Sequence, residues 1–131
     1  MAYSRGADAK AFNDPMVVCA YVKNSAAETN VKIPVPWNDV KCTYIYSVVE
    51  TVIDGTGDME VDFEFNAAGG TEFATLTVAA SAAVGTVTEG TITNSTTAAL
   101  FTEKSFINVE IDGSSTGTGA LNLYFYFEPI L

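Results

Sequence analysis

Apolar and polar residues alternate with a period of two along much of the chain. In residues 59–65 the odd positions are apolar and the even positions are acidic. Residues 106–112 and 120–127 also have apolar side chains at the odd positions 107, 109 and 111 and 121, 123, 125 and 127. Successive side chains of a strand point to opposite faces, whereas helical spacing would mix these charged and apolar positions around the cylinder. The alternation therefore predicts strands with one buried face.

Further runs rich in β-branched and aromatic residues raise the expected number of strands to about eight. These runs are residues 16–23, 30–35, 40–53, 71–80 and 86–93. The breaks between runs are rich in glycine, serine, threonine and other turn-forming residues. They fall at residues 54–58, 67–70, 94–97 and 113–119. Short strands joined by such turns predict an all-β, antiparallel β-sandwich, with one helical turn within residues 98–104.

Two segments depart from the alternation. Residues 1–15 show no periodicity and predict an extended N-terminal arm outside a single sandwich domain of residues 16–131. Terminal arms are ordered only when something holds them, so we expect this arm to contact a neighbouring molecule. Pro34 and Pro36 cannot donate ladder hydrogen bonds, which predicts an edge strand or an extended crossover before Trp37.

Composition and charge narrow the classes of protein. The 131 residues suit one domain, and 48% hydrophobic with 17% charged residues argues against disorder. The sequence shows neither an apolar run of about 20 residues nor a secretion signal, so we expect a soluble protein that folds in the cytoplasm. The net charge of −10 divides into +1 for residues 1–41 and −11 for residues 42–131. Such an acidic body disfavours nucleic-acid binding.

Side chains that commonly carry catalysis are sparse. The chain has no histidine, which removes Ser-His-Asp and Cys-His arrangements and histidine-based metal sites. Cys19 and Cys42 lie in apolar runs, where we expect small buried hydrophobes rather than a disulfide. We therefore predict that the protein is not an enzyme and needs no cofactor.

Two groups of carboxylates keep a chemical interpretation open. Glu60, Asp62 and Glu64 share one face of a strand, as the acids of a glycosidase could, although the alternation already explains them as a solvated face. Asp54 and Asp58 flank a glycine-containing loop that could wrap a calcium ion. A hairpin turn is the simpler interpretation of that loop, so Asp54 and Asp58 are weak calcium candidates.

Four tyrosines occupy the outward parity of two expected strands: Tyr44 and Tyr46 in one, Tyr124 and Tyr126 in the other. Burial under another layer, a subunit interface and a sugar-stacking platform all fit this placement, because tyrosine combines apolar area with a hydroxyl. Trp37 could either anchor a contact or cap the core.

Four stretches stand out beside the strand pattern and the extended arm: residues 31–37, 53–58, 67–71 and 78–85. With these stretches the chain resembles phage virion proteins, in particular small capsid decoration (cement) proteins. The resemblance implies a jelly-roll-like sandwich that forms a homotrimer, binds the major capsid protein on the outer capsid surface of the virion, and contacts neither nucleic acid nor a membrane. It also implies assembly in the host cytoplasm.

For this role we expect the arm and the proline-flanked crossover to face the capsid, while the outward tyrosines form subunit contacts. The predicted interface residues are Tyr3, Arg5, Lys10, Phe12, Pro34, Pro36, Trp37, Tyr124 and Tyr126. The alternative function is a carbohydrate- or receptor-binding module of a phage tail or fibre, which would use the exposed tyrosines. A glycosidase that works through carboxylates alone is the third interpretation.

Overall fold

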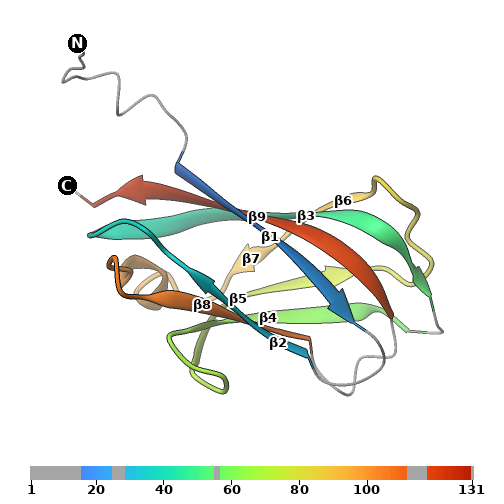
Figure 1. Cartoon of the computed structure of the whole chain (residues 1–131), viewed down its shortest axis with the longest axis horizontal. Helices are drawn as coiled ribbons and strands as arrows, with labels where there is room; N and C mark the ends of the chain where they lie inside the picture. The colour runs from blue at the N-terminus through green and yellow to red at the C-terminus, as the bar shows by residue number, and fades with distance from the viewer. Residues whose placement is uncertain (1–15, 25–28, 55–56, 112–117, 131) are drawn as a thin grey trace, which may run out of the picture.

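The structure is a computed structural model that describes residues 16–24, 29–54, 57–111 and 118–130, and it is an all-β sandwich (Figure 1). The strands are β1 (Met16–Asn24), β2 (Thr29–Pro34), β3 (Val40–Asp54), β4 (Met59–Phe65), β5 (Thr71–Val78), β6 (Val87–Glu89), β7 (Thr91–Ile92), β8 (Phe106–Ile111) and β9 (Thr118–Pro129). A 3-10 turn, η2 (Thr97–Ala99), is the one helical element in the described part of the chain. No helix among these residues is long and apolar enough to cross a membrane.

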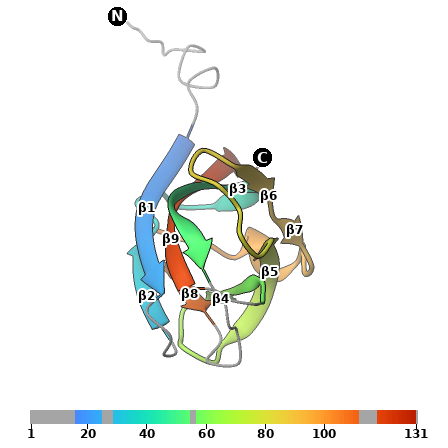
Figure 2. The same ribbon diagram turned by 90° about the vertical axis from the view of Figure 1, so that its right-hand side faces the viewer.

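The strands form two antiparallel sheets that pack face to face. One sheet has the order β1-β9-β3-β6 and the other has the order β2-β8-β4-β5-β7. With the two-residue β7 set aside, β1 to β4 alternate between the sheets and β5 to β9 return along them, which is jelly-roll connectivity. The edge strands β1 and β2 lie on the same side of the sandwich (Figure 2). The predicted sandwich is therefore confirmed, with nine strands among the described residues.

Alternation places the core between the sheets, as predicted. Odd positions of β4, β8 and β9 point inward, and Phe63 of β4 meets Phe125 of β9 edge to face with ring centroids 5.4 Å apart. Phe101, from the loop after η2, packs against both Phe73 and Phe127. Aromatic rings contribute large buried areas and favour this geometry. The two sheets are therefore joined by rings at the centre and at one end.

The expected strand at residues 86–93 is two strands, because the chain changes sheets at Gly90. β6 pairs with β3 in one sheet, and β7 pairs with β5 in the other. The Gly90 N–H donates to the Ile45 carbonyl at 2.7 Å, and a Cβ at Gly90 would lie 3.1 Å from the Thr75 oxygen. A side chain at this position would require the neighbouring strands to move by a few tenths of an ångström, so the close approach favours glycine.

The predicted helical turn within residues 98–104 is present but begins earlier, at Thr97. Asn94 explains the start, because its side-chain oxygen accepts the Thr97 N–H at 3.0 Å.

Candidate binding surface

The outer side of the β1-β9-β3-β6 sheet is covered with tyrosines and valines. Because core-facing residues occupy the alternate positions of each strand, the outward positions of all four strands share one surface. We call this surface the tyrosine face. Its members are Val17, Cys19 and Tyr21 of β1, Tyr124 and Tyr126 of β9, Tyr44, Tyr46 and Val48 of β3, and Val87 of β6.

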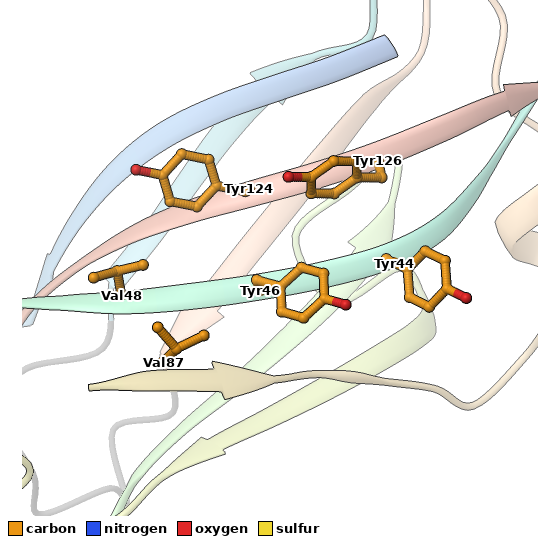
Figure 3. Close-up of a pocket in the computed structure, with 6 residues that line it drawn as sticks. All are labelled: Tyr44, Tyr46, Val48, Val87, Tyr124 and Tyr126. Atoms are coloured by element: carbon orange, nitrogen blue, oxygen red, sulfur yellow. The ribbon is translucent and has the colours of Figure 1, made fainter. Parts of the chain in front are cut away.

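The tyrosine rings contact one another across the sheet. Tyr44 and Tyr46 are stacked with centroids 6.1 Å apart and an interplanar angle of 19°, and Tyr46 meets Tyr126 edge to face at 5.8 Å. These rings, together with Tyr124 and two valines, line an open hollow of about 650 Å³ (Figure 3). Tyr44 keeps 51% of its surface exposed, and the other three rings are half-buried. Neither complete burial nor full solvation describes this surface.

Charged residues lie at the rim of the tyrosine face rather than within it. Partial burial raises the pKa of the Tyr46 phenol, and the carboxylate of Glu89, its partner across the β3–β6 ladder, raises that pKa further. At one end of the face the Asn122 amide donates to the Glu50 carboxylate at 2.6 Å. The centre therefore offers rings and hydroxyls, and the edges offer ionic contacts.

The two cysteines point to opposite sides of the same sheet. Cys42 faces the core, and burial raises the pKa of its thiol to about 12. Cys19 is exposed on the tyrosine face, so the prediction that both cysteines are buried is wrong for Cys19. An edge strand leaves its outward side chains uncovered, which the apolar character of residues 16–22 did not reveal. Both thiols are free, as expected.

The outer side of the other sheet is acidic, and we call it the acidic face. Its charged members are Lys32 of β2, Glu60, Asp62 and Glu64 of β4, Glu72 of β5 and Glu110 of β8. The glycosidase candidates Glu60, Asp62 and Glu64 thus lie on one open sheet surface with outward threonines.

Within the acidic face Glu64 is buried, so the prediction of a fully solvated row is wrong at this position. Its Oε1 accepts the Gly69 N–H and the Asn108 amide, each at 2.9 Å, because residues 66–70 fold back over it. The Asn108 amide also donates to Asn30 at 2.9 Å. The Asn108 Oδ1 is buried without a hydrogen-bond partner among the described residues. Glu64 is therefore occupied by a structural network.

The weak calcium candidates Asp54 and Asp58 lie where β3 ends and β4 begins. The Asp58 Oδ1 accepts the Ala80 N–H at 2.9 Å, which fixes the turn after β5, and the Asp54 carbonyl accepts the Thr118 hydroxyl at 3.3 Å. No group of three or more acidic, cysteine or histidine side chains is placed to hold a metal among the residues that the structure describes.

The predicted capsid-facing residues fall into two groups. Tyr3, Arg5, Lys10 and Phe12 lie outside the described residues. Pro34 and Pro36 are exposed around the buried Val35, whereas Trp37 is half-buried against Phe127 with ring centroids 5.6 Å apart. Trp37 therefore caps the core.

The crossover lies at the end of the sandwich where β1 begins. Met16, the first residue of β1, pairs with Phe127, on which Trp37 packs. The Ile130 N–H donates to the Asp39 carbonyl at 2.8 Å, which brings the end of β9 to the same place (Figure 1). Met16, the first described residue, consequently lies at the end of the sandwich that carries the exposed prolines.

Sequence reasoning found Tyr44, Tyr46, Tyr124 and Tyr126 but missed that Tyr21, Cys19 and Val87 extend the same surface. The parity of residues 17–21 carried a signal for two of them, since the core-facing positions of that run are even. Val87 depends on the pairing of β6 with β3, which no local pattern encodes. No protein-family model matches the chain, and no curated protein or solved structure is significantly similar to it.

Proposed function

We propose that this protein is a non-enzymatic structural protein of a phage virion that binds the outer capsid lattice and stabilises it. The observation that carries the proposal is the convergence of the exposed prolines Pro34 and Pro36 with the start of β1 at one end of a rigid sandwich. The exposed prolines and Met16, the first described residue after the predicted arm, thus lie at the same end of the sandwich. The virion assignment itself rests on the resemblance to decoration proteins.

The charge distribution supports attachment through that end. Residues 1–41 carry +1, whereas the rest of the chain carries −11. Met16, Pro34 and Pro36 belong to the near-neutral segment and lie at the proposed attachment end, so attachment there would leave the acidic body facing solvent, where like charge keeps copies apart. Many weak attachments on a symmetric lattice add avidity without a large area for each copy.

Shell binding tests the proposal with two variants. Protein lacking residues 2–12, and the exposed substitution Pro36→Glu, should each remain folded and lose binding to empty shells of the phage capsid protein, measured by co-sedimentation. Thr77→Glu is the matched control, because it adds the same charge at an exposed position of β5 on the acidic face. Full occupancy of the shells by the truncated protein would refute attachment through this end.

A carbohydrate-binding module is the second candidate, favoured by the open hollow between the tyrosines. Tyrosine rings with a neighbouring amide and carboxylate, here Asn122 and Glu50, offer both stacking and hydrogen bonds. A glycan array discriminates the two functions, because a capsid decoration protein should give no selective signal there.

A further inference from the structure

The tyrosine face is self-complementary about the line between its two central strands. In the β3–β9 ladder Tyr46 lies beside Tyr124, and Tyr44 lies beside Tyr126. The next outward pair of the same ladder, beyond the inward pair Cys42 and Phe127, is Lys41 beside Glu128. Consider two copies stacked with their tyrosine faces together and related by a twofold axis parallel to the strands. This axis would place β3 of one copy over β9 of the other, so each of these tyrosines would face a tyrosine of the second copy. The same rotation would set each Lys41 against a Glu128.

The outer strands continue this relation. Tyr21 of β1 and Val87 of β6 occupy the same row, because both lie level with the Asn122–Val48 pair. Tyr21 is 55% exposed and Val87 is 63% exposed. The same rotation would set Tyr21 of one copy on Val87 of the other and would bury two of the most exposed apolar side chains together.

Charge favours this face over the rest of the described surface for contact between identical copies. The rim of the tyrosine face carries Lys23, Lys41, Glu50, Asp54, Glu89 and Glu128, a net charge of −2. The acidic face carries a net charge of −4 from its six charged members. Like charges facing each other are destabilising, so two copies repel through their acidic faces much more than through their tyrosine faces.

The size of the face sets the strength to expect. Three strands about 4.8 Å apart, with about nine residues each rising 3.4 Å, and the three-residue β6 at the edge make a surface of about 490 Å². Two such surfaces would bury about 1,000 Å² together, which is the size of weak or transient interfaces. The contact should therefore be reversible and depend on concentration.

We infer that two copies of this chain pair through their tyrosine faces, related by a twofold axis that runs along the line between β3 and β9. Tyrosine contacts form the centre of the interface, and reciprocal Lys41–Glu128 ion pairs fix the register. Pairing is independent of capsid binding: a protein that pairs but ignores shells would keep this inference and lose the proposed function.

Sedimentation velocity over a range of protein concentrations tests the association. The wild type should shift from monomer to dimer, and Tyr44→Ser should weaken the dimer at least about 30-fold, because central aromatic residues dominate interface energies. Leu100→Ser is the matched control, since Leu100 is 52% exposed but follows η2 and belongs to neither sheet. Its dissociation constant should equal that of the wild type.

Charge reversal on separate chains tests the register. Lys41→Glu and Glu128→Lys should each weaken pairing about tenfold, because each replaces two attractive contacts by two repulsive ones. An equimolar mixture of the two variants should form heterodimers at least as strong as the wild type, since every contact then joins opposite charges. Circular dichroism checks that each variant is folded, and the mixture gives the answer even where a single variant is destabilised.

Three results would overturn the inference. The first is a wild type that stays monomeric throughout the concentration range, as a glycan-binding face would. The second is a trimer mass, which a twofold axis cannot produce. The third is a mixture of the charge variants that associates no better than either variant alone. Rapid Cys19–Cys19 cross-linking would point instead to pairing of β1 edges, since the proposed rotation sets Cys19 opposite β6 rather than opposite itself.

Discussion

The two outer faces of this sandwich are built by the same alternation but differ in chemistry. The tyrosine face carries rings that contact one another and charges only at its rim, whereas the acidic face places carboxylates on three of its five strands. An antiparallel sheet needs only one buried face, so its outer residues are free to serve contact or solubility. The difference in chemistry is the reason that the inferred pairing of two copies is assigned to the tyrosine face rather than to the acidic face.

The acidic face contains a buried hydrogen-bond network as well as solvated carboxylates. Asn108→Asp disrupts this network and should have the largest effect on stability. The new carboxylate would be buried beside Glu64, so unfolding free energy near neutral pH should fall by about 3–5 kcal/mol. Repulsion and burial would raise the pKa of Asp at position 108 above its unfolded value. The loss should therefore shrink as pH falls towards the unfolded pKa, measured by urea unfolding at several pH values.

Asn38→Asp is the control for that experiment. Asn38 is exposed, and its Oδ1 accepts the Glu103 N–H, a role that a carboxylate can keep. Its stability should change by less than about 1 kcal/mol. Equal losses at Asn38 and Asn108 would mean that added negative charge, rather than the buried network, governs the acidic face.

The core side of the tyrosine-bearing sheet should make stability sensitive to alkaline pH. Burial raises the pKa of Cys42 from 9.0 to about 12, so the folded state keeps a proton that the unfolded chain loses. The contribution of this thiol to the free energy of unfolding should be fully present below pH 9.0. The free energy of unfolding should then fall between pH 9.0 and about 12, with a slope approaching about 1.4 kcal/mol per pH unit. Cys42→Val should remove this part of the slope in urea unfolding, and an unchanged slope would show that other groups, such as Tyr46, produce it.

The smallest expected effect is in thiol labelling, which compares the two sides of that sheet without changing the stability of the protein. An alkylating reagent should modify the exposed Cys19 of the native protein and leave the buried Cys42 unmodified. Mass spectrometry should then find one label per native chain and two labels in denaturant. Labelling of both thiols at equal rates would mean that the sheet opens often, and the distinction between its sides would not hold in solution.

Much of the fold was predictable because it depends on local alternation. The bounds of β4 agreed to the residue, and the inward positions of β8 and β9 were identified, since period-two burial leaves a direct trace in the sequence. The division of residues 86–93 was not predicted, because glycine is favoured at position 90 by contacts with Ile45 and Thr75 that are distant in sequence. Glu64 was misjudged for the same reason, since its partner Asn108 lies 44 residues away.

The sequence by itself determined which side chains point inward and which point outward, because a strand alternates whatever it pairs with. It thereby predicted a sandwich with four tyrosines on the side of their strands opposite the core, and left open whether another layer covers them. Only the tertiary structure decided which strands lie side by side, since strand pairing is set by packing between distant segments. That pairing sets Tyr44 beside Tyr126, Lys41 beside Glu128 and Tyr21 level with Val87. The outward side chains of four separate strands thus form one surface, and its two halves match about the line between β3 and β9.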